Sequence, residues 1–362
     1  MNAADSQWMA QALRLAEQGL YTTSPNPRVG CVLVKDNTII GEGWHERAGE
    51  PHAEVHALRA AGNAAHGATA YVTLEPCSHY GRTPPCADAL IAAGVARVSV
   101  AMQDPNPLVA GQGIAKLRAA GIEVESGLME AAARELNVGF IARMTRGTPW
   151  VRSKIAASLD GRTALANGTS KWITGEAARR DVQHWRARSC AVLTGIGTVL
   201  ADDPQLNVRT PSGARQPLRV VLDSELRISG SAQILQGKHV LIYTACADAA
   251  KRSAIEACGA DVVVLPGADG KVDLSAMLRD LAQRGVNELL VEAGRTVNGA
   301  LLKAGLVDEV VLYLAPQLLG DAARGLADLG ELTRLPGVAL VWNDVRQVGA
   351  DLRIIAKISK EK

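Results

Sequence analysis

The chain has 362 residues, 48% hydrophobic and 21% charged, a composition that is ordinary for a globular enzyme and excludes an extensively disordered protein. Lysine and arginine number 39 against 37 for aspartate and glutamate, so the chain lacks the basic surplus that drives nonspecific binding to nucleic acids. Because the length is about twice that of a usual domain, we expect two domains.

Neither the first residues nor the interior of the chain predict a membrane location. Residues 1–5 show no basic segment followed by an apolar run, and no segment reaches the roughly 18 apolar residues of a membrane span. We therefore expect a cytoplasmic protein with no membrane partner. Six cysteines are too few for a disulfide scaffold, and we interpret Cys31, Cys190, Cys246 and Cys258 as packing residues.

Helical and strand patterns alternate through the first part of the chain. Apolar residues at helical spacing predict a helix that begins at Ser6 and ends near Gly19. Strands are predicted at 29–34, 39–43, 70–73, 98–101 and 122–125, and further helices at 52–61, 86–93, 113–120 and 130–143. This alternation indicates an α/β sandwich with partly parallel strands.

A polar stretch at 145–149, Thr-Arg-Gly-Thr-Pro, separates this pattern from a second one. We therefore predict two domains, 1–147 and 148–362. In the second domain we expect strands at 151–156, 191–194, 219–222, 240–244, 262–265, 288–292 and 309–314, and helices at 176–189, 274–284 and after Thr296. The second domain is thus also predicted to be α/β.

A zinc site is predicted by His52, Cys77 and Cys86, with Glu54 two residues from the histidine. One imidazole and two thiolates hold zinc and leave its fourth position to water, whose protons a nearby carboxylate can move. The order H-x-E, then P-C, then a second cysteine is the signature of zinc-dependent nucleobase deaminases. Because Cys86 opens a predicted helix, we also expect its thiolate form to be favoured there.

A closed structural zinc site is the alternative interpretation. It needs a fourth protein ligand, which His56 or His79 would supply. The usual cysteine pair is spaced C-x-x-C, but here residues 78–85 separate the two cysteines. His79 and Arg82 in this insertion suit an anionic group, so we expect a nucleotide rather than a free base as substrate.

Three segments of the second domain place Gly, Ser, Thr and Arg at predicted strand ends, namely 154–163, 194–204 and 291–299. The last segment runs from a strand through a Gly-flanked turn into a helix. Such a turn either presents backbone N–H groups to a phosphate or is an ordinary helix cap. Together the three segments predict a nucleotide cleft.

Several motifs resemble one family, the bifunctional riboflavin-biosynthesis proteins. In the first domain they are residues 24–31 (Ser-Pro-Asn-Pro-Arg-Val-Gly-Cys), 43–54 and 75–86. In the second they are 157–162 (Ala-Ser-Leu-Asp-Gly-Arg), 170–174, 199–204, 223–224 and 291–294. The family joins a diaminohydroxyphosphoribosylaminopyrimidine deaminase to a 5-amino-6-(5-phosphoribosylamino)uracil reductase. The resemblance implies a cytidine-deaminase-like αβα sandwich followed by a dihydrofolate-reductase-like α/β domain.

In the first domain the resemblance implies that His52, Cys77 and Cys86 bind zinc and that Glu54 is the proton shuttle. Asn26, His45 and Arg82 would contact the substrate, although Asn26 is equally explained as a turn residue. The implied reaction is hydrolytic deamination of 2,5-diamino-6-ribosylamino-4(3H)-pyrimidinone 5′-phosphate.

In the second domain the resemblance implies NADPH-dependent reduction of the ribosyl group to ribityl. The implied NADPH contacts are Ala156, Trp172, Thr198, Asp202, Ser224, Gly294, Arg295, Thr296, Val297, Asn298, Gly299 and Ala300. The implied substrate contacts are Ser170, Arg186, Leu206, Arg209 and Glu292, with the arginines at the phosphate. Without the resemblance, Arg186 would be interpreted as a surface charge on a helix.

The expected partner is therefore a small pyrimidine ribotide and not a nucleic acid, and we expect a homo-oligomer. A polynucleotide deaminase with an RNA-binding second half would instead predict a basic, aromatic-rich second domain, yet the chain has a single phenylalanine, Phe140. A regulatory protein with a structural zinc is the third hypothesis, and it predicts a fourth protein ligand.

Overall fold

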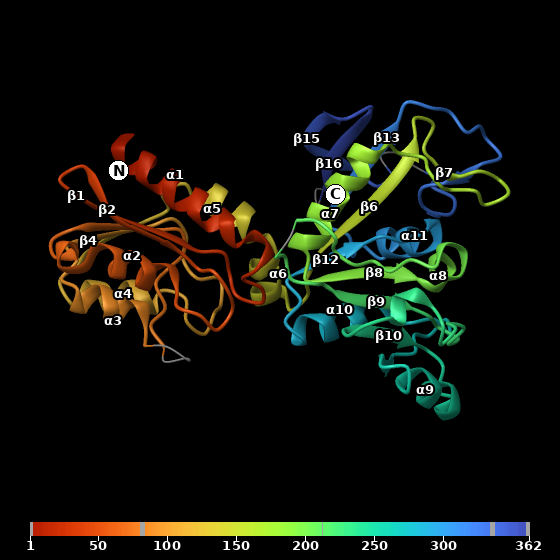
Figure 1. The fold of residues 1–362 in the computed structure, drawn as a ribbon, viewed down its shortest axis with the longest axis horizontal. Helices are drawn as coiled ribbons and strands as arrows, with labels where there is room; N and C mark the ends of the chain where they lie inside the picture. Colours follow the sequence, from red (N-terminus) through yellow and green to blue (C-terminus); the bar gives the residue numbers. More distant parts are fainter. Residues whose placement is uncertain (1–2, 80–83, 212, 334–336, 360–362) are drawn as a thin grey trace. The chain divides into compact units, whose positions relative to one another are not determined.

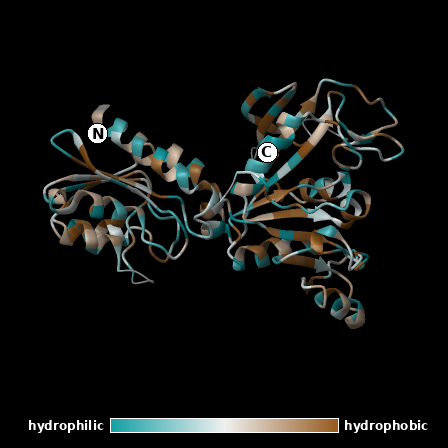
Figure 2. Cartoon of the chain, in the orientation of Figure 1, coloured by the Kyte–Doolittle hydropathy of each residue, from teal (hydrophilic) through white to brown (hydrophobic). Residues whose placement is uncertain are grey.

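The structure is a computed structural model that describes residues 3–79, 84–211, 213–333 and 337–359. The chain folds into two compact units, Met1–Gly147 and Thr148–Lys362, and each unit is built around its own β-sheet (Figure 1). Hydrophobic residues lie along the central strands of both sheets (Figure 2). Each unit therefore has its own core.

The first unit contains a five-stranded sheet in the order β2-β1-β3-β4-β5. The central strand β1 is antiparallel to β2 and β3, while β4 and β5 continue parallel to β3. The strands are β1 (Gly30–Lys35), β2 (Thr38–Trp44), β3 (Thr69–Val72), β4 (Arg97–Val100) and β5 (Glu123–Ser126). Helices α1 and α5 cover one face, and α2, α3 and α4 cover the other (Figure 1). The helices are α1 (Ala3–Glu17), η1 (Gln18–Tyr21), α2 (Ala53–Ala61), η2 (Gly62–Ala65), α3 (Cys86–Ala92), α4 (Gln112–Ala119), α5 (Glu130–Leu136) and α6 (Val138–Arg146).

Helix α2 lies unusually close to strand β2 because two glycines of the strand face it. A Cβ atom on Gly43 would come within 2.4 Å of the Ala53 carbonyl oxygen, and one on Gly41 within 2.3 Å of the Ala57 carbonyl oxygen. Real Cβ contacts are not that short, so both positions require glycine. This packing fixes the amino-terminal turn of α2.

The second unit contains a nine-stranded sheet in the order β11-β10-β9-β8-β12-β6-β13-β16-β15. Neighbours from β11 to β13 are parallel, whereas β16 pairs antiparallel with β13 and with β15. The strands are β6 (Trp150–Ser158), β7 (Arg162–Ala164), β8 (Ala191–Gly195), β9 (Leu218–Leu222), β10 (Val240–Thr244), β11 (Asp261–Val264), β12 (Glu288–Val291), β13 (Glu309–Ala315), β14 (Arg324–Gly325), β15 (Leu340–Val348) and β16 (Asp351–Ile358). The helices are α7 (Glu176–Arg188), α8 (Ile196–Asp202), η3 (Gln233–Leu235), α9 (Ala249–Glu256), α10 (Leu274–Gln283) and α11 (Arg295–Lys303). Strands β7 and β14 form a separate pair.

Several predicted elements differ from the observed ones. Ser6 lies inside α1 rather than at its start. The single helix predicted at 130–143 is two helices, because the Asn137 side chain accepts a hydrogen bond from the Arg28 N–H and donates one to the Arg28 carbonyl oxygen. The glycine-rich segment after β8 forms helix α8 instead of a turn. The predictions lacked α9, β15 and β16 altogether.

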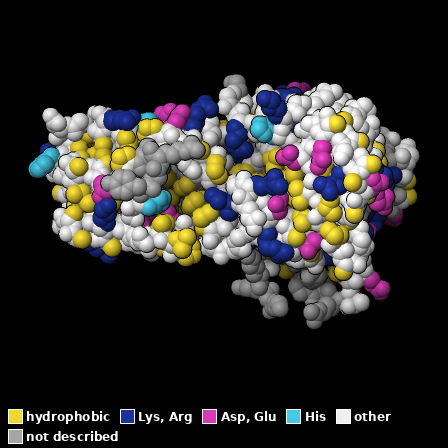
Figure 3. Space-filling model, turned by 90° about the horizontal axis from the view of Figure 1, so that it is seen from below, with side chains coloured by type: hydrophobic (Ala, Val, Ile, Leu, Met, Phe, Trp, Pro, Cys, Tyr) yellow, Lys and Arg dark blue, Asp and Glu magenta, His cyan; other side chains and the backbone are white. Residues whose placement is uncertain are grey.

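On the face of the second unit seen in Figure 3, basic and acidic side chains are interspersed, in keeping with the near balance of charges. None of the helices in the described part of the chain combines the length and apolar character needed to cross a bilayer.

Candidate active sites

Three metal-binding side chains meet in the first unit at the ends of separate elements. His52 caps the amino terminus of α2, Cys77 follows β3 and Cys86 is the first residue of α3. His52 Nδ1 lies 3.6 Å from Cys77 Sγ and 3.3 Å from Cys86 Sγ, and all three donor atoms lie within 4.8 Å of one another. Tetrahedral zinc, with bonds of about 2.3 Å to sulfur and about 2.0 Å to nitrogen, needs such spacings. The donor set and its geometry therefore fit zinc.

Neither His56 nor His79 joins this cluster. Within the part of the chain that the structure describes, the only group of donors that could hold a metal is His52, Cys77 and Cys86. His79 is exposed, and the buried His56 Nε2 has no hydrogen-bond partner among the described atoms. Three protein ligands leave one tetrahedral position for water, which is the pattern of catalytic rather than structural zinc.

Glu54 is the buried carboxylate beside this cluster. Its side chain is on the first turn of α2, and its Oε2 atom is buried without a hydrogen-bond partner in the described structure. Burial raises the pKa of Glu54 to about 7, although the charge of His52 acts to lower it. A carboxyl group with such a pKa takes up and releases protons near neutral pH.

The Cys77 sulfur receives the backbone N–H at the start of α3 that was expected to favour the thiolate of Cys86. The first backbone N–H of α3, that of Cys86, points to Cys77 Sγ at 3.3 Å rather than to its own side chain. Hydrogen bonds from Cys86 and His52 lower the pKa of Cys77 to about 4. The neighbouring Cys77 sulfur and burial together raise the pKa of Cys86.

Asn26 and His45 also lie at the cluster. The Asn26 Nδ2 atom is 3.0 Å from His45 Nε2, and His45 Nδ1 is 3.1 Å from the Pro51 carbonyl oxygen. The His45 and His52 rings meet edge to face with centroids 5.2 Å apart. Asn26 thus belongs to a turn and also contacts His45, whose ring lies against that of His52. Arg82, the third predicted contact, lies outside the described residues.

A cavity of about 1130 Å³ opens in the second unit at the carboxyl ends of parallel strands β6, β8 and β12. Most residues predicted to contact NADPH or substrate line it: Ala156, Ser170, Trp172, Thr198, Asp202, Arg186, Leu206, Arg209, Glu292, Gly294, Arg295, Thr296 and Val297. Helix α11 begins at this cavity, with Gly294 as its capping residue, so its free N–H groups are available to a phosphate.

Four residues of the predicted NADPH site do not line this cavity. Ser224 accepts a hydrogen bond from the Val272 N–H through its hydroxyl oxygen. Asn298 is buried, with its amide donating to the Ala293 carbonyl oxygen and its Oδ1 accepting from Ser153. Gly299 packs against the Asp328 backbone. Ala300, the fourth, follows these two residues in α11. Asn298 and Gly299 thus face the interior of the unit rather than the cavity.

The cavity also contains Lys154, which the sequence indicates as a polar neighbour of the reacting sugar, and residues that the predicted contacts did not include. Lys154 lies 3.9 Å from Glu292, and Arg179 stacks at 4.6 Å over the exposed Trp172 ring. Gln183 and Asn207 also line the cavity. Lys154 is two residues before the predicted contact Ala156 in the same strand. Side chains two residues apart in a strand lie on one face of the sheet.

Arg186 forms a two-point ion pair with Glu292 inside this cavity. Arg186 Nε lies 2.5 Å from Glu292 Oε1, and Nη2 lies 3.0 Å from Oε2. A third donor, Nη1, reaches the Asn207 carbonyl oxygen. Burial acts to raise the pKa of Glu292, but the Arg186 charge outweighs it and the pKa is lowered. Arg186 is thus a cavity residue and not a surface charge.

Comparisons with known proteins agree with both halves. Residues 2–102 match the cytidine and deoxycytidylate deaminase zinc-binding region, and residues 149–354 match the RibD C-terminal domain. The riboflavin biosynthesis protein RibD of Escherichia coli strain K12 is 51% identical over 361 residues, 96% of this chain and 98% of that protein. That of Haemophilus influenzae is 48% identical and covers 98% and 97%.

Solved structures show the same arrangement within each unit. A RibD structure from Acinetobacter baumannii aligns with a TM-score of 0.93 at 49% identity and covers 99% of both chains. The diaminohydroxyphosphoribosylaminopyrimidine deaminase/5-amino-6-(5-phosphoribosylamino)uracil reductase of Thermotoga maritima aligns with a TM-score of 0.87 at 34% identity, covering 98% of this chain and 99% of that one.

Fold and sites together define a bifunctional enzyme with a zinc-binding, cytidine-deaminase-like domain and a reductase domain, so the predicted fold class is confirmed. The chain belongs to the RibD family of riboflavin biosynthesis proteins. It is a deaminase and reductase of riboflavin biosynthesis, and the cofactors of its two domains are zinc and NADPH.

Proposed function

We propose that the unit Met1–Gly147 deaminates 2,5-diamino-6-ribosylamino-4(3H)-pyrimidinone 5′-phosphate and that the unit Thr148–Lys362 reduces the product, 5-amino-6-(5-phosphoribosylamino)uracil. The observation that carries the proposal is the unpartnered, buried Oε2 atom of Glu54 next to three zinc-type donors. A buried oxygen without a partner is costly unless a substrate or water meets it in the working enzyme.

In the deaminase site, His52, Cys77 and Cys86 would hold zinc. Zinc supplies a Lewis acid that lowers the pKa of water. Glu54 accepts a proton from the water that attacks the amino-bearing ring carbon, and it returns protons to the ring nitrogen and to the departing amino group. The ring gains an oxygen and ammonia leaves. Asn26 and His45 hold the pyrimidine against Glu54, and we assign Arg82 to the substrate as well.

In the reductase site, the amino terminus of α11 and the residues around it would hold NADPH, which supplies a hydride. Ala156, Trp172, Thr198 and Asp202 would hold NADPH together with residues 294–297, and Thr198 and Asp202 lie on α8. Glu292, Ser170 and Leu206 orient the sugar, and Arg209 meets its phosphate. When bound, NADPH would supply the hydride that reduces C1′ of the ring-opened ribose, and a proton taken up from solvent would complete the conversion to ribityl.

We further propose a cytoplasmic location and a homo-oligomeric assembly. Cys77 and Cys86 bind zinc only as reduced thiols, which suits a reducing compartment. The substrate on this proposal is a small ribotide, and no nucleic acid is involved.

The proposal is tested with the purified, zinc-loaded full-length chain, the diaminopyrimidine ribotide and NADPH, by following ammonia and NADPH oxidation separately. Glu54→Gln should abolish ammonia release and leave reduction of the deaminated intermediate intact. Glu123→Gln is the matched control, because this carboxylate is 68% exposed on β5. Loss of both activities in a folded, zinc-loaded Glu54→Gln variant would contradict the two-site scheme.

A further inference from the structure

Glu75 is a buried carboxylate two residues before Cys77, and it is only 5% exposed. Its four hydrogen-bond donors are all backbone N–H groups of one later segment. Oε2 accepts from Asp104 at 3.0 Å and from Gly111 at 2.9 Å. Oε1 accepts from Gly113 at 2.8 Å and from Ile114 at 3.2 Å. One side chain therefore gathers residues 104–114 around the segment that carries a metal ligand.

This arrangement attaches helix α4 to the Cys77 segment. Gly113 and Ile114 are in the first turn of α4, whose N–H groups lack partners within the helix and attract a negative charge. A Cβ atom on Gly113 would come within 2.0 Å of the Pro76 carbonyl oxygen, so the helix backbone rests directly on the residue before Cys77. The backbone between Glu75 and Cys77 is thus held from two sides.

The same helix is also tied to the second cysteine. Lys116 of α4 forms an ion pair of 2.5 Å with Asp88 of α3, the helix that begins at Cys86. Helix α4 therefore contacts both thiol-bearing segments. Because residues 78–85 separate the two cysteines, the short C-x-x-C turn that usually fixes such a pair is absent from this sequence. The relative position of the two sulfur atoms must depend on contacts such as these.

We propose that Glu75 is a positioning residue of the metal site: by clamping the start of α4 onto residues 75–77, it sets the place of Cys77 Sγ relative to His52 and Cys86. The inference rests on the proposed zinc-dependent function. Outer groups that orient metal ligands typically change metal affinity by about 10–100-fold when they are removed.

Glu75→Gln tests this proposal in the full-length chain. The amide keeps the size of the side chain but replaces one acceptor oxygen with a donor that faces N–H groups. Zinc affinity is measured by competition with a chromophoric chelator, and ligand geometry is read from the visible absorption of the cobalt(II)-substituted protein. We expect zinc to dissociate at least about tenfold more readily and the cobalt bands to shift.

Asp5→Asn is the matched control for general destabilisation. Asp5 is a carboxylate of the same unit and is similarly buried, with 4% of its surface exposed. It accepts hydrogen bonds from Tyr71 and Arg97, neither of which is a metal ligand. We expect this variant to lose stability and to keep the wild-type zinc affinity and cobalt spectrum. If Glu75→Gln behaves in the same way as Asp5→Asn, the positioning role is wrong.

Gly111→Ala provides the test if Glu75→Gln does not fold. Gly111 has a φ of +80° and donates to Glu75, so alanine strains the turn without removing the carboxylate. A shift in zinc affinity in the same direction supports the proposal, and an unchanged affinity overturns it. Failure of the wild-type chain to bind zinc would instead overturn the proposed function, so the two failures are distinguishable.

Discussion

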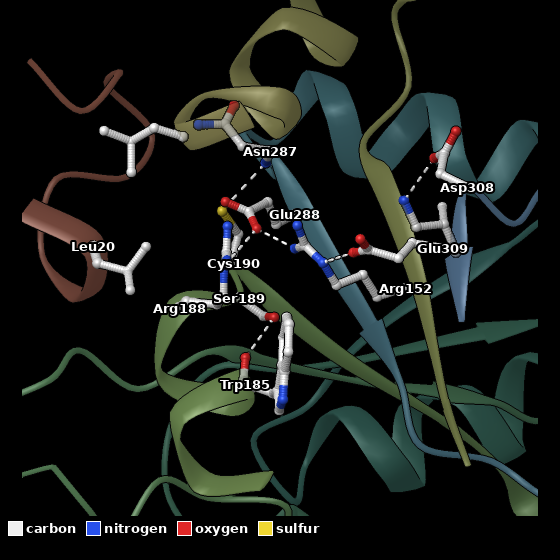
Figure 4. A network of polar contacts seen from close by, with 12 residues as sticks. Leu20, Arg152, Trp185, Arg188, Ser189, Cys190, Asn287, Glu288, Asp308 and Glu309 are labelled. Carbon is white, nitrogen blue, oxygen red and sulfur yellow. Dashed lines mark hydrogen bonds and ion pairs between the residues drawn. The ribbon is translucent and has the colours of Figure 1, made fainter. Parts of the chain in front are cut away.

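Arg152 and Glu288 form an ion pair in the core of the second unit, and each side chain is only 2% exposed (Figure 4). Arg152 also pairs with Glu309 on β13, and Arg188 of α7 reaches Glu288 Oε2 at 3.0 Å. Strands β12, β6 and β13 are neighbours in the sheet, so this cluster joins the three strands. Glu292 follows the last residue of β12 and is four residues beyond Glu288, a spacing that places the two side chains on the same side of the chain in extended backbone.

Replacing Arg152 should therefore destabilise the second unit strongly. Arg152→Met leaves two buried carboxylates without their shared cation, and removing one partner of a buried ion pair costs about 3–5 kcal/mol. Denaturant unfolding of the full-length chain measures the loss. Arg180→Met breaks an exposed pair on α7, 68% and 72% exposed, and should change stability by less than about 1 kcal/mol. Equal effects of the two substitutions would contradict this account.

Arg209 should bind the substrate phosphate in the reductase. Arg186 already uses three donors on Glu292 and Asn207, whereas the exposed Arg209 side chain lines the same cavity. A hydrogen bond to a charged group contributes about 1.5–3 kcal/mol, so Arg209→Ala should raise KM for the phosphorylated intermediate by about 10–100-fold. The change in kcat should be smaller, and ammonia release should be unaffected. An unchanged KM would assign the phosphate to other residues.

Ammonia release should depend on pH through Glu54. The group accepts a proton only as a carboxylate, and burial raises its pKa to about 7, which bound zinc lowers. The deaminase kcat/KM should therefore fall as the pH is lowered through the pKa that Glu54 has in the zinc-loaded enzyme, and it should level off above that pKa. Measurements between about pH 5 and pH 8 check this, with reduction of the deaminated intermediate as the internal comparison. A deaminase profile that is flat over that range would argue against Glu54 as the base.

Removing zinc should separate the two activities. A chelator should abolish ammonia release and leave NADPH oxidation with the deaminated intermediate, because the donor cluster lies wholly within the first unit. Zinc that binds only the folded state stabilises it by about 4 kcal/mol at a thousandfold excess over Kd. We therefore expect the first unit to unfold at a lower temperature after chelation, and added zinc to restore both properties. Loss of NADPH oxidation on chelation would show that the units depend on one another.

The metal site was predictable from the sequence because each ligand stands at the end of an element that the sequence pattern also defines. His52 precedes a helix, Cys77 follows a strand and Cys86 opens the next helix. Glu75 was not singled out, because its four donors are backbone groups between residues 104 and 114, and residue types carry no signal for such contacts.

The reductase cavity was predictable only in part. Motifs locate a segment such as 294–300, but neighbouring residues of a helix point in different directions, so Asn298 faces the core while Val297 lines the cavity. Strand β15 escaped prediction because its apolar residues do not alternate and its register shifts between Trp342 and Asp344. Arg186 and Glu292 are 106 residues apart in the sequence, so the spacing of residues along the chain does not predict that they pair.

Gly41 and Gly43 make the deaminase site depend on strand β2, which lies behind it. Both glycines admit the backbone of α2, whose first turn carries His52 and Glu54. A larger residue at either position would displace the start of α2, and with it His52 and Glu54. Substitutions at these two glycines would therefore alter the deaminase site without changing any of its own residues.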